Sequence, residues 1–183
     1  MNRKHIELKN APTGRDKWSK SPIVVLLWIL IEWCLVTNPL QLSSRVRVAA
    51  LRLFGAKIGK AVIFRPRTRV KCPWNLEIGN FCWIGEGVWF HNQDRIQVGD
   101  DVCISQETFL TTGSHDWKKD MALLTNPINI GSGVWVASRC NILMGSNIGN
   151  NSIVSCGVTV SGIVPTNVIV NFSGTKEIDL EHS

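Results

Sequence analysis

The stretch INIGSGVWVASRCNILMGSNIGNNSIVSCGVTV, residues 128–160, carries an aliphatic residue at every sixth position: Ile130, Val136, Ile142, Ile148 and Val154. A small or β-branched residue stands four places after each of them, at Val134, Cys140, Ser146, Ser152 and Val158. A six-residue period fits neither an amphipathic helix nor an antiparallel meander of long alternating strands. It predicts a chain that forms a short strand, turns a corner and repeats.

The same pattern extends toward the N-terminus. The further pairs are Ile58 with Val62, Ile78 with Cys82, Ile84 with Val88, Val98 with Val102, and Ile104 with Thr108. Three such strands make one coil of about 18 residues, so the chain is expected to fold as an all-β solenoid, a left-handed parallel β-helix of hexapeptide repeats. The aliphatic residues then stack in a triangular core. Glycines that directly follow them relieve backbone crowding between coils, at Gly59, Gly79, Gly85, Gly99, Gly131 and Gly149.

The spacing between coils locates an insertion. Ile58, Ile78 and Val98 are 20 residues apart, which is one coil with a two-residue corner insertion. Val98 and Ile130 are 32 residues apart, so this coil carries 14 extra residues. Counting in sixes from Val98 places the insertion directly after His115, as a loop over residues 116–129.

The length of 183 residues fits one domain with short appended segments. We expect a basic and apolar helical segment over residues 1–50, the β-helix over residues 51–171, and a C-terminal tail over residues 172–183. The net charge of +6 favours anionic partners. The six cysteines form no CxxC pair or cysteine–histidine cluster, which argues against a metal site and favours reduced thiols in the cytoplasm. Cys82 and Cys140 occupy the small core positions, where they are expected to pack.

Residues 22–36 form an apolar stretch, PIVVLLWILIEWCLV, with one charged residue. It is shorter than the roughly 20 residues that span a bilayer, and no cleavable signal is evident. One interpretation is a helix packed on the body of the protein or at a subunit interface. The other is a peripheral contact with the inner face of the membrane, which the tryptophans and the basic N-terminus favour.

Beyond the repeats, six motifs resemble the hexapeptide-repeat acyltransferase superfamily, in particular the O-acetyltransferases of colanic acid and exopolysaccharide biosynthesis. The resemblance covers roughly residues 51–169. It rests on LRLFGAKIG (51–59), CPWNLEIGN (72–80), WIGEGVW (83–89), CISQ (103–106), TGSHD (112–116) and PINIGSGVWVAS (127–138). It implies a homotrimer that uses acetyl-CoA, without a metal, to acetylate a carbohydrate. Acetyl-CoA would lie in the groove between neighbouring β-helices.

Acetyl transfer to a sugar hydroxyl needs a base for the hydroxyl proton. By similarity to the family, His115 would be this base and would promote direct attack on the acetyl carbonyl; the alternative is a histidine that caps the loop. Asp116 would orient its imidazole, or else start a turn. Asn92 matches a family asparagine near the acceptor, and Asp94 is a second acceptor candidate. The alternative for Asn92 is a corner residue with a left-handed backbone.

For acetyl-CoA, the resemblance implies a row of residues near the C-terminal coils. Trp135 matches a tryptophan that lines the pantetheine channel, or is an outward surface aromatic, and Ala137 and Ser138 follow it. Ser155 and Cys156 lie in a turn whose backbone binds the cofactor arm. A family Thr-Lys-Asp turn is replaced at Ser161 and Gly162, and a Gly-Asn-Pro-Ala-Lys stretch keeps only Lys176. Lys176 and Arg139 are the cations left to contact the phosphates.

A basic segment and two alternative functions complete the sequence-based predictions. Arg65, Arg67, Arg69 and Lys71 alternate, so on one strand they would share a face, either as a solvated edge or as a site for a lipid-linked pyrophosphate sugar. The stripe lacks the stacking aromatics of a nucleic-acid module, so no nucleic acid is expected. A non-catalytic β-helix scaffold is the alternative to the enzyme. A zinc hydrolase on this solenoid would need three histidines, and only His91 and His115 lie within it.

Overall fold

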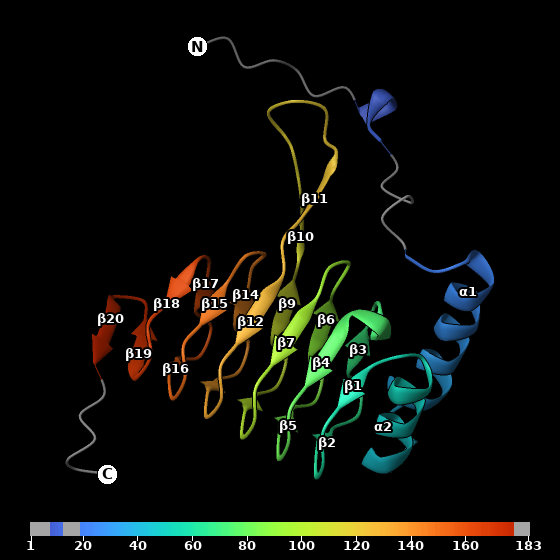
Figure 1. Ribbon diagram of the computed structural model, residues 1–183, viewed down its shortest axis with the longest axis horizontal. Coiled ribbons are helices and arrows are strands. Elements are labelled where there is room, and N and C mark those ends of the chain that lie inside the picture. The colour runs from blue at the N-terminus through green and yellow to red at the C-terminus, as the bar shows by residue number, and fades with distance from the viewer. Residues whose placement is uncertain (1–7, 13–18, 178–183) are drawn as a thin grey trace.

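The computed structural model describes residues 8–12 and 19–177. Their main body is a parallel β-solenoid whose coils stack along one axis, with helices at the N-terminal end (Figure 1). Each coil except the last contributes one strand to each of three sheets, within which the coils pair in parallel. This confirms the β-helix predicted from the six-residue period.

Sheet A contains β1 (Lys57–Ile58), β4 (Leu76–Ile78), β7 (Ile96–Val98), β12 (Ile128–Ile130), β15 (Asn147–Ile148) and β18 (Ile163–Val164). Sheet B contains β2 (Ile63–Phe64), β5 (Trp83–Ile84), β8 (Cys103–Ile104), β13 (Trp135–Val136), β16 (Ile153–Val154), β19 (Val168–Asn171) and β20 (Gly174–Glu177). Sheet C contains β3 (Arg69–Val70), β6 (Trp89–His91), β9 (Phe109–Thr111), β14 (Asn141–Ile142) and β17 (Thr159–Val160).

The predicted core rows point inward. Every aliphatic residue of the six-residue series from Ile58 to Val154 is buried, and so are its small partners except Val62, which is partly buried. The small polar partners bond to the next coil; Ser152, for example, donates from Oγ to the Pro165 carbonyl at 2.7 Å. Cys82 does the same with its thiol, 3.1 Å from the Gly99 carbonyl, and burial raises its pKa. The packing role predicted for this cysteine is confirmed.

Gly79 shows why glycine follows the inward aliphatic residue. A Cβ at this position would lie 2.6 Å from the carbonyl oxygen of Gly99, one coil further along. Real Cβ atoms essentially never come this close to backbone. The coils can therefore stack only when this corner carries no side chain.

The insertion is a two-stranded hairpin of β10 (Gly113–His115) and β11 (Leu123–Thr125) that projects from the solenoid (Figure 1). The predicted loop over residues 116–129 is therefore shifted. The projection starts at Gly113, and residues 128–130 already form β12 of the next coil. Counting in sixes gave the length of the insertion but not the point where the chain leaves the coil, because Thr111 and Thr112 remain buried at its base.

The helical segment begins with a single turn, η1 (Leu8–Asn10). It then contains α1 (Pro22–Ile31), the π-helical η3 (Glu32–Val36) and α2 (Ser44–Leu53); a further short turn, η4 (Pro73–Asn75), lies in the first coil. Ser21 and Ser43 cap α1 and α2 by accepting hydrogen bonds at their N-termini. The segment ends at Leu53, three residues beyond the predicted boundary.

One side of α1 packs on the solenoid, as one of the two interpretations of this segment predicted. Trp28 is buried and donates from Nε1 to the Val70 carbonyl at 2.8 Å. Arg47 of α2 is fully buried and donates to the carbonyls of Val36, Asn38 and Gln41, which closes the loop between the helices. No helix of the described residues is long and apolar enough to cross a membrane.

The predicted C-terminal tail contains a strand. β20 pairs antiparallel with β19 and places Lys176 opposite Ile169, so sheet B extends to Glu177. The remaining tail residues, 178–183, lie outside the described residues, as do residues 1–7 and 13–18 of the N-terminal segment.

Replacing Ile104 with Ala tests the stacked core. Ile104 is fully buried between coils, so this change should lower the free energy of unfolding by about 2–5 kcal/mol. Ile163 is 82% exposed on β18, and Ile163→Ala should change it by less than about 0.5 kcal/mol. Urea denaturation measures both, and equal losses would contradict the assigned inward and outward rows.

Candidate functional site

His115 ends β10 on the outgoing arm of the hairpin, with its side chain exposed. Its Nδ1 lies 2.8 Å from the carbonyl oxygen of Met121 on the returning arm. A carbonyl oxygen only accepts, so Nδ1 carries the proton in this contact. In the neutral ring, Nε2 is then the unprotonated nitrogen. The hairpin thus presents an imidazole in the tautomer that a general base requires.

Asp116 serves the turn of the hairpin and not the imidazole. Its Oδ1 accepts from the Lys118 amide at 3.2 Å, and its backbone bonds to Ala122 and Met121. The Asp116 carboxylate thus bonds within the turn, while His115 Nδ1 is bonded to the Met121 carbonyl; the catalytic role of Asp116 stays a prediction. The Met121 carbonyl takes the orienting position, which no side-chain pattern could have indicated.

Asn92 is fully buried at a corner of the solenoid. Its Oδ1 accepts from the Cys72 amide at 3.0 Å, and its Nδ2 donates to the Cys72 carbonyl at 2.7 Å. Both ends of the side-chain amide are thus used to join adjacent coils. The side chain does not reach the surface in this structure, so its predicted contact with the acceptor stays a prediction that these bonds do not favour. Its backbone is not left-handed either.

Asp94 lies at the base of the hairpin, with its side chain partly exposed. Its amide donates to Thr112 Oγ1 at 2.9 Å, and its Oδ1 accepts from the Arg95 amide at 2.7 Å. These bonds leave Oδ2 available to a ligand hydroxyl. Asp94 therefore remains a candidate for contacting the sugar that receives the acetyl group.

The residues predicted to bind acetyl-CoA gather on sheet B and on the corner between sheets B and C. Trp135 points outward from β13, 48% exposed, and donates from Nε1 to Ser105 Oγ at 3.0 Å. Ala137 and Ser138 form the corner that follows, and Ser138 Oγ donates to Gln106 Oε1 at 3.0 Å. Trp135 is thus an outward aromatic held in one orientation beside a polar corner.

One coil further on, Ser155 and Cys156 occupy the equivalent corner. The amide of Gly157 donates to the Ser138 carbonyl at 2.9 Å, which stacks the two corners. Cys156 is exposed. Phe172 reaches the same place, since a Cβ at Gly157 would lie 3.4 Å from its Cζ. Lys176 is exposed on β20, in the same sheet as Trp135.

The two groups of candidates lie on different edges of the solenoid. The hairpin with His115 projects from the solenoid at the corner between β9 of sheet C and β12 of sheet A. The corner with Ser138 and Ser155 lies between sheets B and C. A single chain therefore presents a base on one edge and the predicted donor row on another.

A pocket of about 240 Å³ lies between α1 and sheet C. Its lining includes Glu32, Arg69, Lys71, Trp89 and His91. Arg69 stands 4.0 Å from the centre of the Trp89 ring, and Glu32 accepts from the Val70 amide at 2.6 Å. Burial raises the pKa of the Glu32 carboxyl. The pocket combines cationic, aromatic and apolar surface.

His91 connects this pocket to the base of the hairpin. Lys71 Nζ lies 3.3 Å from His91 Nε2, and His91 Nδ1 lies 3.0 Å from Thr111 Oγ1, whose hydroxyl donates to the Gly113 carbonyl at 3.2 Å. Burial, Lys71 and Arg69 together lower the pKa of His91 to about 4. The ring is thus neutral at pH 7 and accepts from the ammonium. The partners of His91 are 20 residues away in each direction, so no local sequence pattern indicates its role.

The basic residues of FRPRTRVK do not form the predicted stripe. The chain turns a corner between β2 and β3, where Arg67 has a left-handed backbone and pairs with Glu86 at 3.3 Å. Arg65 stays near β2, while Arg69 and Lys71 belong to the next sheet. The alternation assumed one strand, but the coil bends within this stretch.

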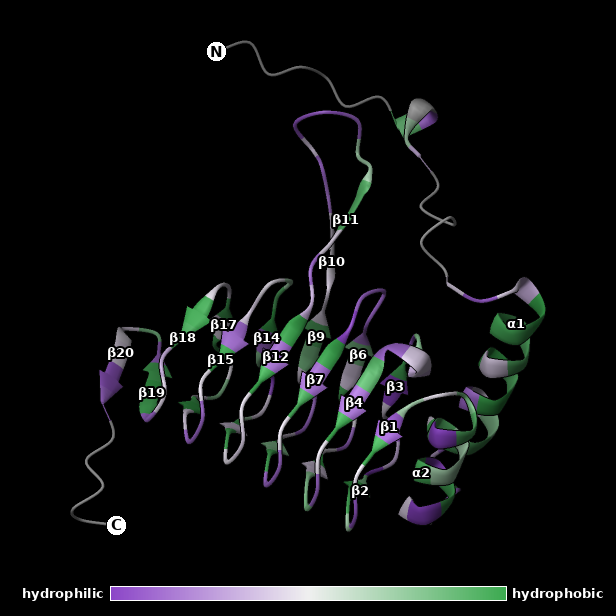
Figure 2. Cartoon of the chain, viewed as in Figure 1, coloured by the Kyte–Doolittle hydropathy of each residue, from purple (hydrophilic) through white to green (hydrophobic). Residues whose placement is uncertain are grey.

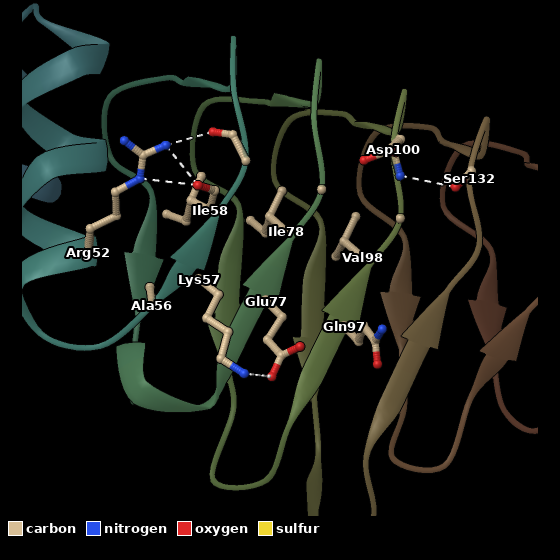
Figure 3. Close-up of a pocket in the computed structure, with 13 residues that line it drawn as sticks. Arg52, Ala56, Lys57, Ile58, Glu77, Ile78, Gln97, Val98, Asp100 and Ser132 are labelled. Carbon is tan, nitrogen blue, oxygen red and sulfur yellow. Dashed lines mark hydrogen bonds and ion pairs between the residues drawn. The ribbon is translucent and has the colours of Figure 1, made fainter.

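A broad groove of about 650 Å³ runs over sheet A (Figure 3). Its outward side chains are polar, and Lys57 pairs with Glu77 at 3.0 Å. Arg52 donates to the carbonyls of Ile58 and Gly59 at its N-terminal end. None of the predicted site residues lines this groove. Within the described residues, no three His, Cys, Asp or Glu side chains gather as a metal site would require.

The amino-acid sequence is similar to those of known acetyltransferases. The chain is 35% identical over 148 residues to a protein of Escherichia coli strain K12 described as a colanic acid biosynthesis acetyltransferase; the match spans 80% of this chain and 81% of the relative. It is 27% identical over 127 residues to the galactoside O-acetyltransferase of the same strain, which spans 67% and 63% of the two chains. No protein-family model matches the chain.

Solved structures share the fold. A hexapeptide-repeat acetyltransferase of Vibrio cholerae, solved with acetyl coenzyme A, superposes with a TM-score of 0.74 at 21% identity, over 84% of this chain and 85% of that one. A galactoside acetyltransferase in complex with coenzyme A gives 0.72 at 22% identity, over 86% and 80%.

The lowered pKa of His91 predicts an acid-dependent loss of stability. Between pH 6.5 and about 4, the unfolded chain binds a proton at this ring and the folded chain does not. Unfolding should therefore become easier as the pH falls through this window. His91→Gln should reduce this pH dependence by about 1 kcal/mol, because the ring is partly open to solvent. Urea titrations at several pH values measure it, and equal pH dependence in the wild type and in His91→Gln would contradict the assignment.

Proposed function

The chain belongs to the hexapeptide-repeat acetyltransferases, and from this membership we propose that it transfers an acetyl group from acetyl-CoA to a sugar hydroxyl of a polysaccharide precursor. The observation that carries the proposal is the bond from His115 Nδ1 to the Met121 carbonyl. That bond directs the basic Nε2 away from the hairpin, where it can meet an acceptor hydroxyl.

In the proposed reaction, Nε2 of His115 removes the proton of the acceptor hydroxyl. The hydroxyl oxygen attacks the carbonyl carbon of the acetyl group directly. The C–S bond of the thioester breaks, and the coenzyme A sulfur leaves and receives the proton from the imidazolium. The protein supplies the base, its orientation and the placement of both substrates. Asp94, at the base of the hairpin, is the proposed contact for a further hydroxyl of the acceptor.

The donor site of the proposal is the row on sheet B and its corner. Trp135 would pack against the pantetheine arm, and the amides of Ser138 and Cys156 would donate to it. The amides of Ala137 and Ser155 beside them already donate to Val154 and Val170 and hold the two corners in place. Lys176 and Arg139 would meet the phosphates, since both are exposed cations near this row. The relatives named as colanic acid and galactoside acetyltransferases support a carbohydrate acceptor.

We further propose that the working form is a homotrimer, as the sequence resemblance implies. His115 and the donor row lie on different edges, so a second copy is needed to bring them together. The outward row of sheet B supports such a contact, because it is largely apolar: Ile63, Trp83, Cys103, Trp135, Ile153 and Ile169. The corresponding row of sheet A is mostly polar.

His115→Ala tests the proposed base. Removing it should lower kcat by about 10²–10⁴-fold, because general-base assistance is lost. Calorimetry should show acetyl-CoA binding at the wild-type affinity, since His115 does not hold the donor. Turnover is measured by mass spectrometry of acetylated products, with acceptors chosen from a panel of mono- and disaccharides.

His91→Gln is the control, because His91 faces the pocket under α1 and should not act on the acetyl group. It should keep most of the wild-type kcat. Full turnover by His115→Ala would contradict the assigned base. A wild-type protein that binds no acetyl-CoA at millimolar concentration would instead favour the non-catalytic scaffold.

A further inference from the structure

The outward side of α1 and η3 is an apolar surface, called here the α1 face. Its side chains are large and well exposed, with relative exposures from 50% to 73%: Ile23, Leu26, Leu27, Ile29, Leu30 and Trp33. Leu40 and Leu42, in the loop before α2, are 86% and 83% exposed. Figure 2 shows α1 mostly in the green of hydrophobic residues, at the end of the molecule opposite β20. Contiguous apolar exposure of this kind marks a contact surface.

The charges around the α1 face have one sign. Between residues 19 and 53 the basic residues are Lys20, Arg45, Arg47 and Arg52, and the only acid is Glu32. Glu32 points inward, where it accepts from the Val70 amide. Arg47 is buried, but Lys20 and Arg45 are exposed. Within residues 19–53, the α1 face therefore has cations near it and no outward carboxylate.

The pocket beneath α1 is lined by two cations and by Glu32, whose carboxyl accepts from the Val70 amide. Ile29 belongs both to the α1 face and to the pocket wall, and Arg69 and Lys71 line the same pocket. An anionic group at the rim of α1 would thus meet two cations directly beside apolar side chains. That combination matches a lipid surface, in which phosphate and acyl chain are adjacent.

We propose that the α1 face binds the surface of an anionic membrane, with α1 and η3 lying in the plane of the interface. Residues 22–36 would extend only about 22 Å as a helix, less than the roughly 30 Å of a hydrocarbon core, so the contact is monotopic. The apolar side chains enter the acyl boundary, and Trp33 takes the interfacial position that tryptophan favours. Lys20, Arg45 and Arg69 meet the headgroups.

The basic residues near the α1 face favour an anionic membrane over a second copy of the chain as its binding partner. Two α1 faces packed together would bring like charges close, and residues 19–53 offer no outward carboxylate to pair with them. An anionic bilayer complements the same charges and covers the same apolar area. This contact goes beyond acetyl transfer, and it would hold even if the catalytic proposal failed.

Sedimentation with vesicles tests the proposal. The protein should bind vesicles of phosphatidylcholine with about 30% phosphatidylglycerol, and bind less at high salt or without the anionic lipid. Leu26→Ser combined with Leu30→Ser should lower the partition coefficient at least tenfold. Ile163→Ser is the matched control, because this aliphatic residue is 82% exposed at the far end of the solenoid, and it should bind like the wild type.

A second test measures how deeply Trp33 enters the bilayer. Brominated lipids should quench the fluorescence of Trp33, and Trp33→Phe should lose that part of the quenching. No sedimentation and no quenching would overturn the proposal. A change of oligomeric state in the Leu26 and Leu30 variant, without any loss of vesicle binding, would also overturn it, because a second copy would then cover the α1 face.

Discussion

The stacking of aliphatic side chains between coils is the constraint on which the rest of the structure depends. Ile84, Ile104 and Val136 follow one another along the inside of sheet B, and each is fully buried. Because the side chain at every sixth position must meet its equivalent in the next coil, each coil turns its corners at the same places. A functional residue is then placed by its position within the coil, however far apart its neighbours are in the sequence.

This regularity explains why one chain carries only parts of the proposed site. The corner between sheets B and C repeats from coil to coil, so Ser138 and Ser155 stack into a row beside Trp135. The hairpin can leave only where the repeat is interrupted, and that point lies between sheets C and A. Because a rigid solenoid does not bend to join the two edges, the proposed site would need a second copy to be complete.

The sequence was sufficient for the fold because a six-residue period has one structural explanation, and the glycine and cysteine positions agree with it. It was less informative wherever a side chain bonds across coils. Asn92 and Cys72 are 20 residues apart, and nothing in the local sequence indicates that the amide is consumed by that bond. Adjacency in sequence does not bring the Asp116 carboxylate to the preceding imidazole; the Met121 carbonyl contacts His115 Nδ1 from across the hairpin. The contacts of His91 could not be predicted either, because Lys71 and Thr111 lie one coil away on each side.

Complementation between inactive subunits tests most directly the claim that each site is shared by two copies. His115→Ala and Trp135→Ala chains, with different affinity tags, would be co-expressed, and the mixed oligomers purified through both tags. In a mixed trimer one of the three sites combines an intact hairpin with an intact donor row, so acetyl transfer should recover to about a third of the wild-type rate. Mixed oligomers of His115→Ala with the double variant should stay inactive. No recovery in the first mixture, with oligomers formed, would show that the two groups do not meet across subunits.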